Sequence, residues 1–197
     1  MENKDIRTEA RILVSELLLE KNINKYMEKL KDKKRFVFKH CINVAYLTAE
    51  ITQQIYSDQE EIKNIVTGAL LHDIGKLYVP DKILYKRGRL TNDEYELVKK
   101  HTIWGYDLIK EEAFTDLTKD IVLSHHEKSS GAGYPYHKKG EEISQGVQIV
   151  TVCDMYDALT EKRTYGDENS AYSALKIIAE EKIENSYFLL LAGCPDK

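Results

Sequence analysis

Histidines and aspartates set in apolar surroundings are the residues through which this chain could do chemistry. Six histidines occur, namely His40, His72, His101, His125, His126 and His137. The first five fall on segments with helical apolar spacing, so several imidazoles are expected to point into a core from different helices. One such histidine is more often a hydrogen-bonded core residue. Five favour a shared metal centre, because a buried imidazole without a partner costs about 1–3 kcal/mol and neutral imidazole is the commonest metal ligand.

Two aspartates extend this candidate ligand set. Asp73 directly follows His72 at an expected helix end, where the partial negative charge of the helix C-terminus favours a cation. Asp154 lies among apolar residues, and a buried carboxylate needs a cation or a strong hydrogen-bond partner. For Asp154 alone, a hydrogen-bonded or capping role explains the pattern as well as metal binding does. Seven candidate ligands exceed the needs of one ion, so we expect two ions bridged by one carboxylate. Mixed imidazole and carboxylate ligands suit iron, manganese, zinc or nickel better than calcium or magnesium.

The elements that carry these residues are predicted to be helices throughout. Apolar spacing predicts helices over residues 5–30, 35–56, 60–73, 91–112, 116–126, 144–162 and 169–184. Thr91 and Glu94 match a capping box, and Gly75 is placed just beyond a helix end. The charged stretch 29–35 is interpreted as a solvated connection, and residues 141–145 as a short extended piece.

Composition limits the class of protein. The 197 residues suit one domain, and the net charge of −4 argues against a duplex nucleic-acid partner, which requires a basic face. Three cysteines without framework spacing indicate reduced thiols. The chain shows no apolar run of membrane-spanning length and no signal-peptide pattern at its start. We therefore expect a cytoplasmic protein without a membrane partner.

Four motifs in fixed order resemble the HD-GYP domain of the HD phosphohydrolase superfamily. They are HDIGK, KRGRLTNDEYELVKKHTIWG, HHEKSSGAGYP and the D-x-x-DAL of CDMYDAL, and the similarity covers residues 40–165. The resemblance implies an all-α helical bundle with a metal centre in its core. It also implies hydrolysis of the phosphodiester bonds of cyclic di-GMP and, in some members, of related cyclic dinucleotides. For cyclic di-GMP the expected product is linear pGpG, with GMP as the alternative end product. Residues 33–197 would form the catalytic domain, and 1–32 an N-terminal helix that packs on it or precedes it.

The resemblance also assigns roles to individual residues. One metal would bind the four ligands His40, His72, Asp73 and Asp154, and the other the three ligands His101, His125 and His126. Asp73 would bridge the two ions, with a water or hydroxide between them. Lys76 would assist proton transfer or hold the phosphate, and Arg163 would lie near the substrate phosphates. Two transition-metal ions per chain are implied, with iron or manganese first and zinc or nickel as alternatives.

The loop HHEKSSGAGYP is the expected substrate contact. Gly131 and Gly133 would let the backbone approach a ligand or adopt positive φ angles. Tyr134 could stack on a guanine base, and Pro135 would stiffen the turn. Taken alone, this is more often a plain surface loop. Directly after two metal-binding histidines, a loop that faces the substrate is the better interpretation.

Two positions depart from the family pattern. Ser130 stands where many members have aspartate, so we expect altered hydrogen bonding in the loop and an intact centre. Phe36 stands one helical turn before His40, where some members carry a glutamate that binds a third metal. A phenyl ring has no lone pair for a cation and is expected to pack in the core, and Arg35 cannot substitute because guanidinium has no acceptor. The sequence therefore predicts two metals.

Alternative functions remain open at this stage. The substrate could be another cyclic dinucleotide or a nucleotide phosphate, and the basic residues Lys86, Arg87 and Arg89 near the expected mouth suit any of these. A signalling module could bind the dinucleotide without hydrolysing it. A diiron oxygenase is a third class, which the glycine loop and the basic residues disfavour. A homodimer or a separate regulatory protein would be the partner.

Overall fold

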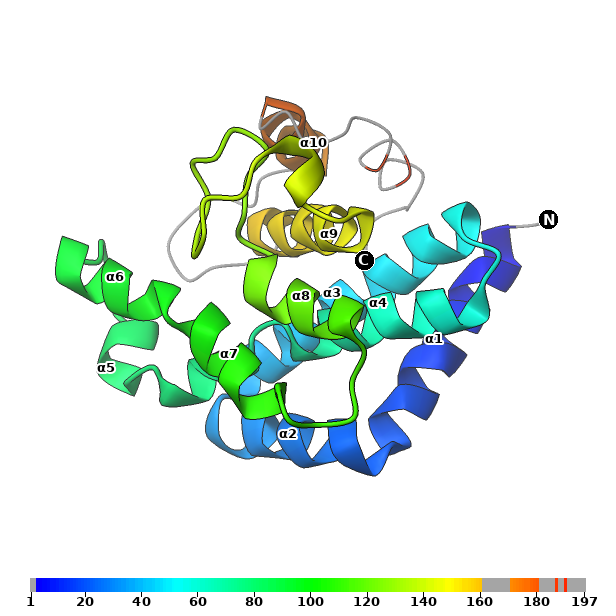
Figure 1. Ribbon diagram of the computed structural model, residues 1–197, viewed down its shortest axis with the longest axis horizontal. Helices are drawn as coiled ribbons and strands as arrows, with labels where there is room; N and C mark the ends of the chain where they lie inside the picture. Colours follow the sequence, from blue (N-terminus) through cyan, green and yellow to red (C-terminus); the bar gives the residue numbers. More distant parts are fainter. Residues whose placement is uncertain (1–2, 161–170, 181–186, 188–189, 191–197) are drawn as a thin grey trace.

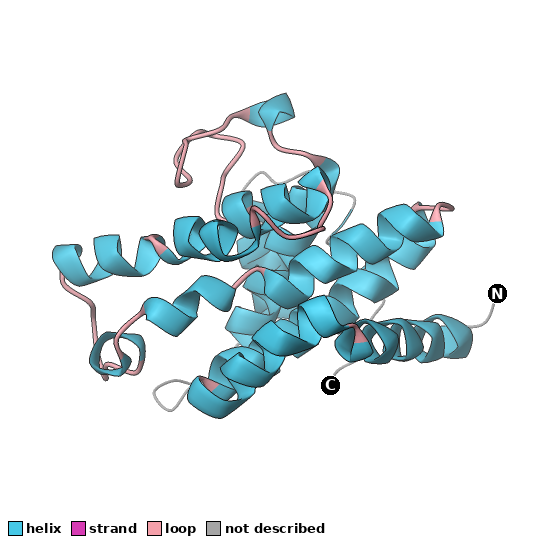
Figure 2. Cartoon of the chain, turned by 60° about the horizontal axis from the view of Figure 1, so that its bottom comes forward, coloured by secondary structure: helices cyan, strands magenta, loops and turns pink. Residues whose placement is uncertain are grey.

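The computed structural model describes residues 3–160, 171–180, 187 and 190. Within these residues the chain is helical, with no strand beyond an isolated bridge between Ser130 and Lys139, so the all-α prediction is confirmed (Figures 1 and 2). The elements are α1 (Asn3–Leu19), α2 (Lys21–Lys33), α3 (Arg35–Ile55), α4 (Gln59–Leu71), η1 (a 3-10 helix, Ile74–Tyr78), α5 (Asp81–Leu84), α6 (Asn92–Lys99), α7 (His101–Ile109), α8 (Asp116–Ser124), η2 (a 3-10 helix, Gly140–Glu142), α9 (Gln145–Thr160) and α10 (Ala171–Glu180). None of these helices combines the length and the apolar character that crossing a membrane requires.

The core is organised around α3, which packs against α1, α2, α4 and α9. Its buried face carries Val37, Cys41, Val44 and Ile51, which recur at the helical spacing seen in the sequence. Each large aliphatic side chain buried in this way contributes about 1.5–3 kcal/mol. His40 lies on the same face and is therefore drawn inside the bundle with these apolar residues.

The prediction of one helix over residues 5–30 is wrong, because the chain forms two helices, α1 and α2, with a break at Glu20. Two asparagine side chains bond to backbone groups at the break and help to stabilise it. The Asn22 side-chain oxygen accepts from the Ile23 amide at 3.1 Å, and the Asn24 amide donates to the Leu18 carbonyl at 3.0 Å. Both helices consequently pack on α3.

The helix expected over residues 91–112 begins as predicted but is also broken. Thr91 accepts from the Glu94 amide at 3.2 Å, and the Glu94 carboxylate accepts from the Thr91 amide at 2.8 Å, which completes the capping box. The helix is interrupted at Lys100, where the backbone N–H bonds back to Leu97. The break separates α6, which has no buried residue, from α7, which begins with the buried His101.

Two predictions about short segments are also wrong. The fourth helix ends at Leu71, and Gly75 lies inside η1 rather than closing that helix. Glycine is needed there because a Cβ on Gly75 would lie 1.9 Å from the His101 carbonyl oxygen, so η1 and α7 are in backbone contact. Residues 141–145 are not an extended piece, since η2 covers Gly140–Glu142 and α9 begins at Gln145.

The junction between α2 and α3 and the first turn of α3 differ from expectation. The stretch 29–35 is not a solvated connection, because Lys34 is buried and its ammonium donates to the Val79 carbonyl at 2.9 Å and pairs with Asp81. Phe36 does not pack in the core and is 46% exposed. The face of α3 that is buried at Val37 meets neighbouring helices, while the ring of Phe36 points away from them into solvent.

Candidate metal centre

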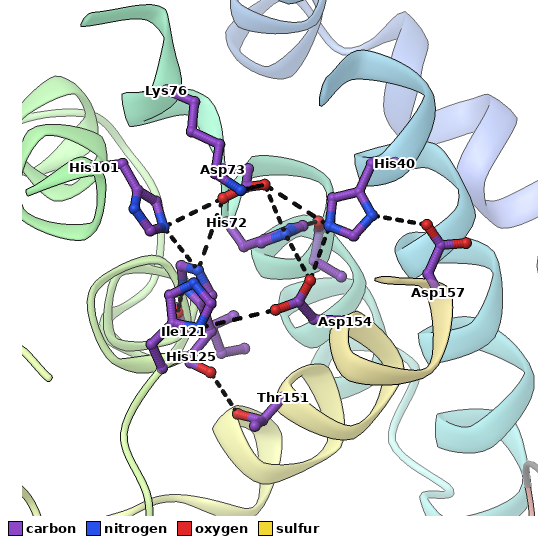
Figure 3. A network of polar contacts seen from close by, with 12 residues as sticks. His40, His72, Asp73, Lys76, His101, Ile121, His125, Thr151, Asp154 and Asp157 are labelled. Carbon is purple, nitrogen blue, oxygen red and sulfur yellow. Dashed lines mark hydrogen bonds and ion pairs between the residues drawn. The ribbon is translucent and has the colours of Figure 1, made fainter. Parts of the chain in front are cut away.

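The seven predicted ligands converge in the core from separate helices, and all of them except His126 are labelled in Figure 3. They are His40 in α3, His72 and Asp73 directly after α4, His101 at the start of α7, His125 and His126 directly after α8, and Asp154 in α9. Six of the seven are buried, and the seventh, His126, has a side chain that is 26% exposed. Residues separated by up to 114 positions thus face one interior point.

The Asp73 carboxylate lies between two groups of histidines. Its Oδ2 atom is 3.5 Å from Nε2 of His72 and 3.8 Å from Nε2 of His40. Its Oδ1 atom is 3.3 Å from Nε2 of His101 and 3.9 Å from Nε2 of His125. Each oxygen therefore faces a different pair of imidazoles. This is the position that a carboxylate bridging two metal ions would need.

The second aspartate closes the gap between these groups. Asp154 Oδ1 lies 2.8 Å from Nε2 of His40 and 3.8 Å from Nε2 of His72. Its other oxygen is 4.0 Å from Nδ1 of His126. Asp154 therefore belongs with His40 and His72, and it also reaches the histidine group on the far side of Asp73.

The imidazoles are held in defined orientations by their Nδ1 atoms. For three of them, Nδ1 contacts a carbonyl of the preceding turn, namely His72 to Ala69 at 2.7 Å, His101 to Val98 at 2.7 Å and His125 to Val122 at 3.1 Å. A carbonyl only accepts, so Nδ1 carries a proton, and whenever the imidazole is neutral Nε2 has the free lone pair. In each case Nε2 is the atom that faces Asp73. Metal-binding histidines in proteins are oriented by such second hydrogen bonds.

Two buried atoms at this point make no hydrogen bond to the described part of the chain. They are Nε2 of His72 and Oδ1 of Asp73. Leaving such groups unsatisfied costs about 1–3 kcal/mol each, and more for a charged group. Cations beside the carboxylate would satisfy both atoms, and the imidazole and carboxylate donors suit transition metals. The residues present therefore fit a metal centre.

The histidine group around Oδ1 of Asp73 is neutral in the folded protein. Burial lowers the pKa of His101 to about 3 and that of His126 to about 4, and it lowers the pKa of His125 well below its usual value. An imidazole can bind a metal only when its ligating nitrogen is unprotonated. These three side chains are thus ready to bind without losing a proton.

The other group has the opposite electrostatic character. Burial lowers the pKa of His40, but hydrogen bonds with Asp154 and Asp157 outweigh it and raise that pKa to about 9. The pKa of His72 is likewise raised against the effect of burial, first by the charge of Asp73. Burial also opposes ionisation of Asp73, yet the charges of Lys76 and His72 hold its pKa well below the usual range. A cation on this side must displace protons from the imidazoles.

Lys76, a predicted substrate and proton-transfer residue, lies beside Asp73. Its Nζ atom is 2.5 Å from Oδ2 of Asp73, and its side chain is 20% exposed. The 3-10 turn of η1 sets this distance, because residues three apart face the same side of such a helix. The ammonium can therefore contact both the bridging carboxylate and a ligand that enters from solvent.

Sequence reasoning missed two carboxylates. Oδ2 of the fully buried Asp157 lies 2.7 Å from Nδ1 of His40, so this aspartate orients the imidazole (Figure 3). Glu127 is 2% exposed and accepts from the amides of Tyr136 at 2.6 Å and Lys138 at 3.0 Å, so it anchors the loop that follows His126. Both residues stand inside quoted motifs, D-x-x-DAL and HHE, and their spacing from the ligands was the available signal.

The glycine loop packs against the centre. Gly131 has a φ of +78°, a left-handed backbone conformation that favours glycine. A Cβ on Gly133 would lie 2.4 Å from the Lys128 amide nitrogen, so glycine is needed there because the loop backbone packs closely on itself. The Tyr134 ring lies 4.8 Å from the His126 ring, centroid to centroid, and a cis peptide bond leads to Pro135. The loop therefore covers a ligand histidine.

Three other predicted residues have different outcomes. Ser130 accepts from the Ala132 amide at 3.3 Å, so it bonds within the loop. Lys86 lies in the loop between α5 and α6, and its ammonium pairs with the Glu94 carboxylate of α6 at 2.5 Å. Arg163 lies outside the described residues.

The sequence of this chain is similar to a known protein family and to several known enzymes. The HD domain family matches residues 24–187. The chain belongs to the HD domain family. This HD domain is 35% identical, over 77% of its length and 37% of the relative's, to a cyclic di-GMP phosphodiesterase of Pseudomonas aeruginosa. It is 38% identical, over 72% of its length and 31% of the relative's, to the 3′3′-cGAMP-specific phosphodiesterase 3 of Vibrio cholerae.

A solved structure with the same fold is the HD domain of the L. monocytogenes phosphodiesterase PgpH in complex with cyclic-di-AMP. The TM-score is 0.62 and the identity 20%, over 80% of each chain. That similarity shows the fold of the HD domain. The chain spans about a third of the length of the curated relatives it matches.

Proposed function

We propose that this HD domain is a metal-dependent phosphodiesterase that hydrolyses cyclic di-GMP to linear pGpG; further hydrolysis of pGpG to GMP is a second outcome that the same assay measures. The observation that carries the proposal is the Asp73 carboxylate, whose two oxygens face two separate histidine groups. Similarity to a cyclic di-GMP phosphodiesterase over most of the chain supports the substrate. We further propose that residues 33–197 form the catalytic unit and that residues 1–32 support it.

The two groups are proposed to hold two transition-metal ions, iron or manganese first. One ion would be held by His40, His72, Asp73 and Asp154, and the other by His101, His125, His126 and again Asp73. Two groups of donor atoms within 4.8 Å of one another support this division, namely His40, His72 and Asp73, and Asp73, His101, His125 and His126. Asp154 is added to the first group because its Oδ1 atom lies 2.8 Å from His40 and 3.8 Å from His72. The exposed Phe36 supports two ions rather than three, because its ring offers no lone pair.

When bound, the ions supply activation of water and neutralise charge on the phosphate. The protein's own residues do the remaining work. Asp73 holds the two ligand groups in register, and Asp157 fixes the orientation of His40 through Nδ1. Lys76 can bind a phosphate oxygen or give a proton to the leaving 3′-oxygen, since it reaches from Asp73 toward solvent. The buried surroundings strengthen each of these electrostatic contacts.

The loop after His126 is proposed to line the substrate. Gly131 and Gly133 set its backbone, and Tyr134 with Pro135 covers the ligand side of His126. Because the Tyr134 ring already packs on an imidazole, we propose that it borders the substrate with its edge rather than stacking as a free platform. Arg163 is proposed to contact the phosphates.

The test begins with protein purified without oxygen, followed by elemental analysis and an assay of cyclic di-GMP hydrolysis. About two ions per chain and formation of pGpG are expected. Asp73→Ala should lose both activity and metal, because the bridge is gone. Asp107→Ala removes an exposed carboxylate that pairs only locally with Lys110, and it should keep both. Three ions per chain, or normal hydrolysis by Asp73→Ala, would contradict the proposal.

A second candidate substrate is another cyclic dinucleotide, favoured by similarity to a 3′3′-cGAMP-specific enzyme. The same metal chemistry would act, since these substrates share the phosphodiester and differ in the bases. Rates on cyclic di-GMP, 3′3′-cGAMP and cyclic di-AMP, measured side by side, separate the candidates. Tight binding without turnover of any of them, with several metals, would indicate a signalling module instead.

A further inference from the structure

Three side chains outside the ligand set meet beside the metal centre, and we call them the rim cluster: Tyr95, Lys99 and Tyr134. The Lys99 ammonium lies 5.4 Å from the ring centroid of Tyr95 and 5.6 Å from that of Tyr134. The Tyr134 ring in turn lies 4.8 Å from the His126 ring. One aromatic ring therefore connects this lysine to a candidate ligand.

The side chains of α6 do not contribute to the buried core of the bundle. That helix contains no buried residue, and it lies at one edge of the molecule beside α5 (Figure 1). Tyr95 is 50% exposed, and the side chain of Lys99 is 24% exposed. An aromatic ring and a cation one helical turn apart thus stand at the surface, on the helix that leads directly to His101.

The charges around Lys99 can be exchanged for those of a ligand. Lys99 pairs with Glu96 at 2.5 Å, and the Glu96 side chain is 63% exposed. An exposed carboxylate loses little when it moves into water, so a phosphate could take its place beside the ammonium. The Tyr95 and Tyr134 rings would remain and hold the ammonium in position through cation–π contact.

The proposed substrate has a second phosphodiester besides the one that the centre would hydrolyse. A cyclic dinucleotide has two phosphodiester groups and two bases, and hydrolysis acts on one phosphorus at a time. Lys76 is already engaged with Asp73 at 2.5 Å. The phosphate that is not attacked therefore needs another cation, and its neighbouring base needs an aromatic face.

We propose that the rim cluster is a substrate subsite in which Lys99 binds the phosphodiester that is not being hydrolysed and Tyr95 stacks on the adjacent base. This inference rests on the proposed function and deepens it. Glu96 is the counter-ion that the phosphate displaces. The subsite selects cyclic dinucleotides over phosphodiesters that have a single phosphate and no base.

A purely positioning role makes a different prediction. If Lys99 only held Tyr134 against His126, losing its charge would disturb the ligand and slow every phosphodiester alike. Bis(p-nitrophenyl) phosphate separates the two roles, because it has one phosphodiester and no nucleobase. The ratio of kcat/KM for cyclic di-GMP to kcat/KM for this compound is the readout, together with metal content.

Lys99→Met keeps most of the side-chain length and removes the charge. We expect it to lower that ratio about tenfold, mainly through KM for cyclic di-GMP, as loss of a charge-assisted hydrogen bond would. Lys99→Arg should recover most of the ratio. Lys100→Met makes the same change at the next, exposed position and should leave the ratio as it is in the unaltered protein. Tyr95→Ala should lower the ratio severalfold, whereas Tyr95→Phe should preserve it.

The outcomes that defeat the inference are distinct. An unchanged ratio in Lys99→Met, or a parallel fall on both substrates with loss of metal, overturns the subsite while the proposed function stands. Failure of the unaltered, metal-loaded protein to hydrolyse any cyclic dinucleotide overturns the proposed function and the subsite with it.

Discussion

The Nδ1 atom of His40 lies 2.7 Å from Oδ2 of Asp157, a fully buried carboxylate one turn along α9 from Asp154. Both nitrogens of this imidazole are therefore engaged by carboxylates of one helix, since Nε2 lies 2.8 Å from Asp154. A histidine that binds a metal through Nε2 is strengthened as a ligand by such a carboxylate on Nδ1. In the proposed centre Asp157 would therefore support metal binding by His40 through this contact.

Asp157→Asn should weaken metal binding about 10- to 100-fold, which is the usual range for losing a partner of this kind. An amide still accepts from Nδ1 but no longer stabilises positive charge on the ring. Competition with a chelator measures the affinity, and circular dichroism checks that the helices remain. Asp107→Asn, at an exposed site, is the control. Wild-type affinity in Asp157→Asn would show that this contact is only structural.

Glu127→Gln should loosen the loop after His126 without removing a ligand. The carboxylate accepts from two loop amides, and an amide side chain has only one oxygen to offer, so one backbone N–H loses its protein partner. A loss of about 1–3 kcal/mol in the free energy of unfolding is expected, with faster proteolysis between residues 128 and 138. Urea denaturation and limited proteolysis measure both effects. Glu141→Gln, at an exposed residue of η2, should change neither.

Gly75→Ala should damage the centre through backbone packing alone. The added Cβ would meet the His101 carbonyl oxygen at 1.9 Å, so η1 and α7 must separate, and Asp73 moves away from His101. Overpacking of this kind costs about 1–3 kcal/mol or more. Gly88→Ala is the contrasting variant, because its φ of +105° is strained for alanine while nothing lies within 4 Å. We expect Gly88→Ala to lower the free energy of unfolding and keep its metal, and Gly75→Ala to lower the free energy of unfolding and lose metal. Urea denaturation and elemental analysis measure the two quantities. Full metal content in Gly75→Ala would contradict the prediction.

The pH dependence of the metal-free protein should have two limbs. The folded-state pKa of His40 is about 9, above the ordinary value near 6.5, so its stabilisation is complete below pH about 6.5 and is lost as the pH rises toward 9. The pKa values of His101 and His126 are about 3 and about 4, so the unfolded chain binds more protons below pH about 6.5 and stability falls as the pH drops toward 3. Urea denaturation with chelator present, from about pH 4 to about pH 9.5, measures both limbs.

Metal addition should release protons, because a ligating imidazole must be neutral. At pH 7 the group containing His40 and His72 is expected to release them, and the group of His101, His125 and His126 is not. Calorimetric titration in two buffers of different ionisation enthalpy measures this release. No proton release at any metal stoichiometry would contradict the charge asymmetry between the two groups.

Much of the fold followed from local patterns in the sequence. The capping box of Thr91 and Glu94 and the apolar spacing of α3 depend on residues within a few positions of each other, so they could be read directly. The breaks at Glu20 and Lys100 escaped prediction because apolar spacing continues across them. They reflect asparagine side chains bonding to the backbone in one case and the burial of His101 in the other.

The identities of the candidate ligands were visible in the sequence alone, because five histidines and two aspartates in apolar settings need partners that a shared metal centre supplies. Tertiary structure decided how they are arranged: that the two oxygens of Asp73 face different imidazoles, that Asp157 orients His40 across 117 positions, and that Lys99 lies between two tyrosine rings. The exposure of Phe36 and the burial of Lys34 belong with these, since the amino-acid type alone favours the opposite. The physical reason is that side-chain chemistry is a property of each residue, whereas direction and distance depend on how separate helices pack together.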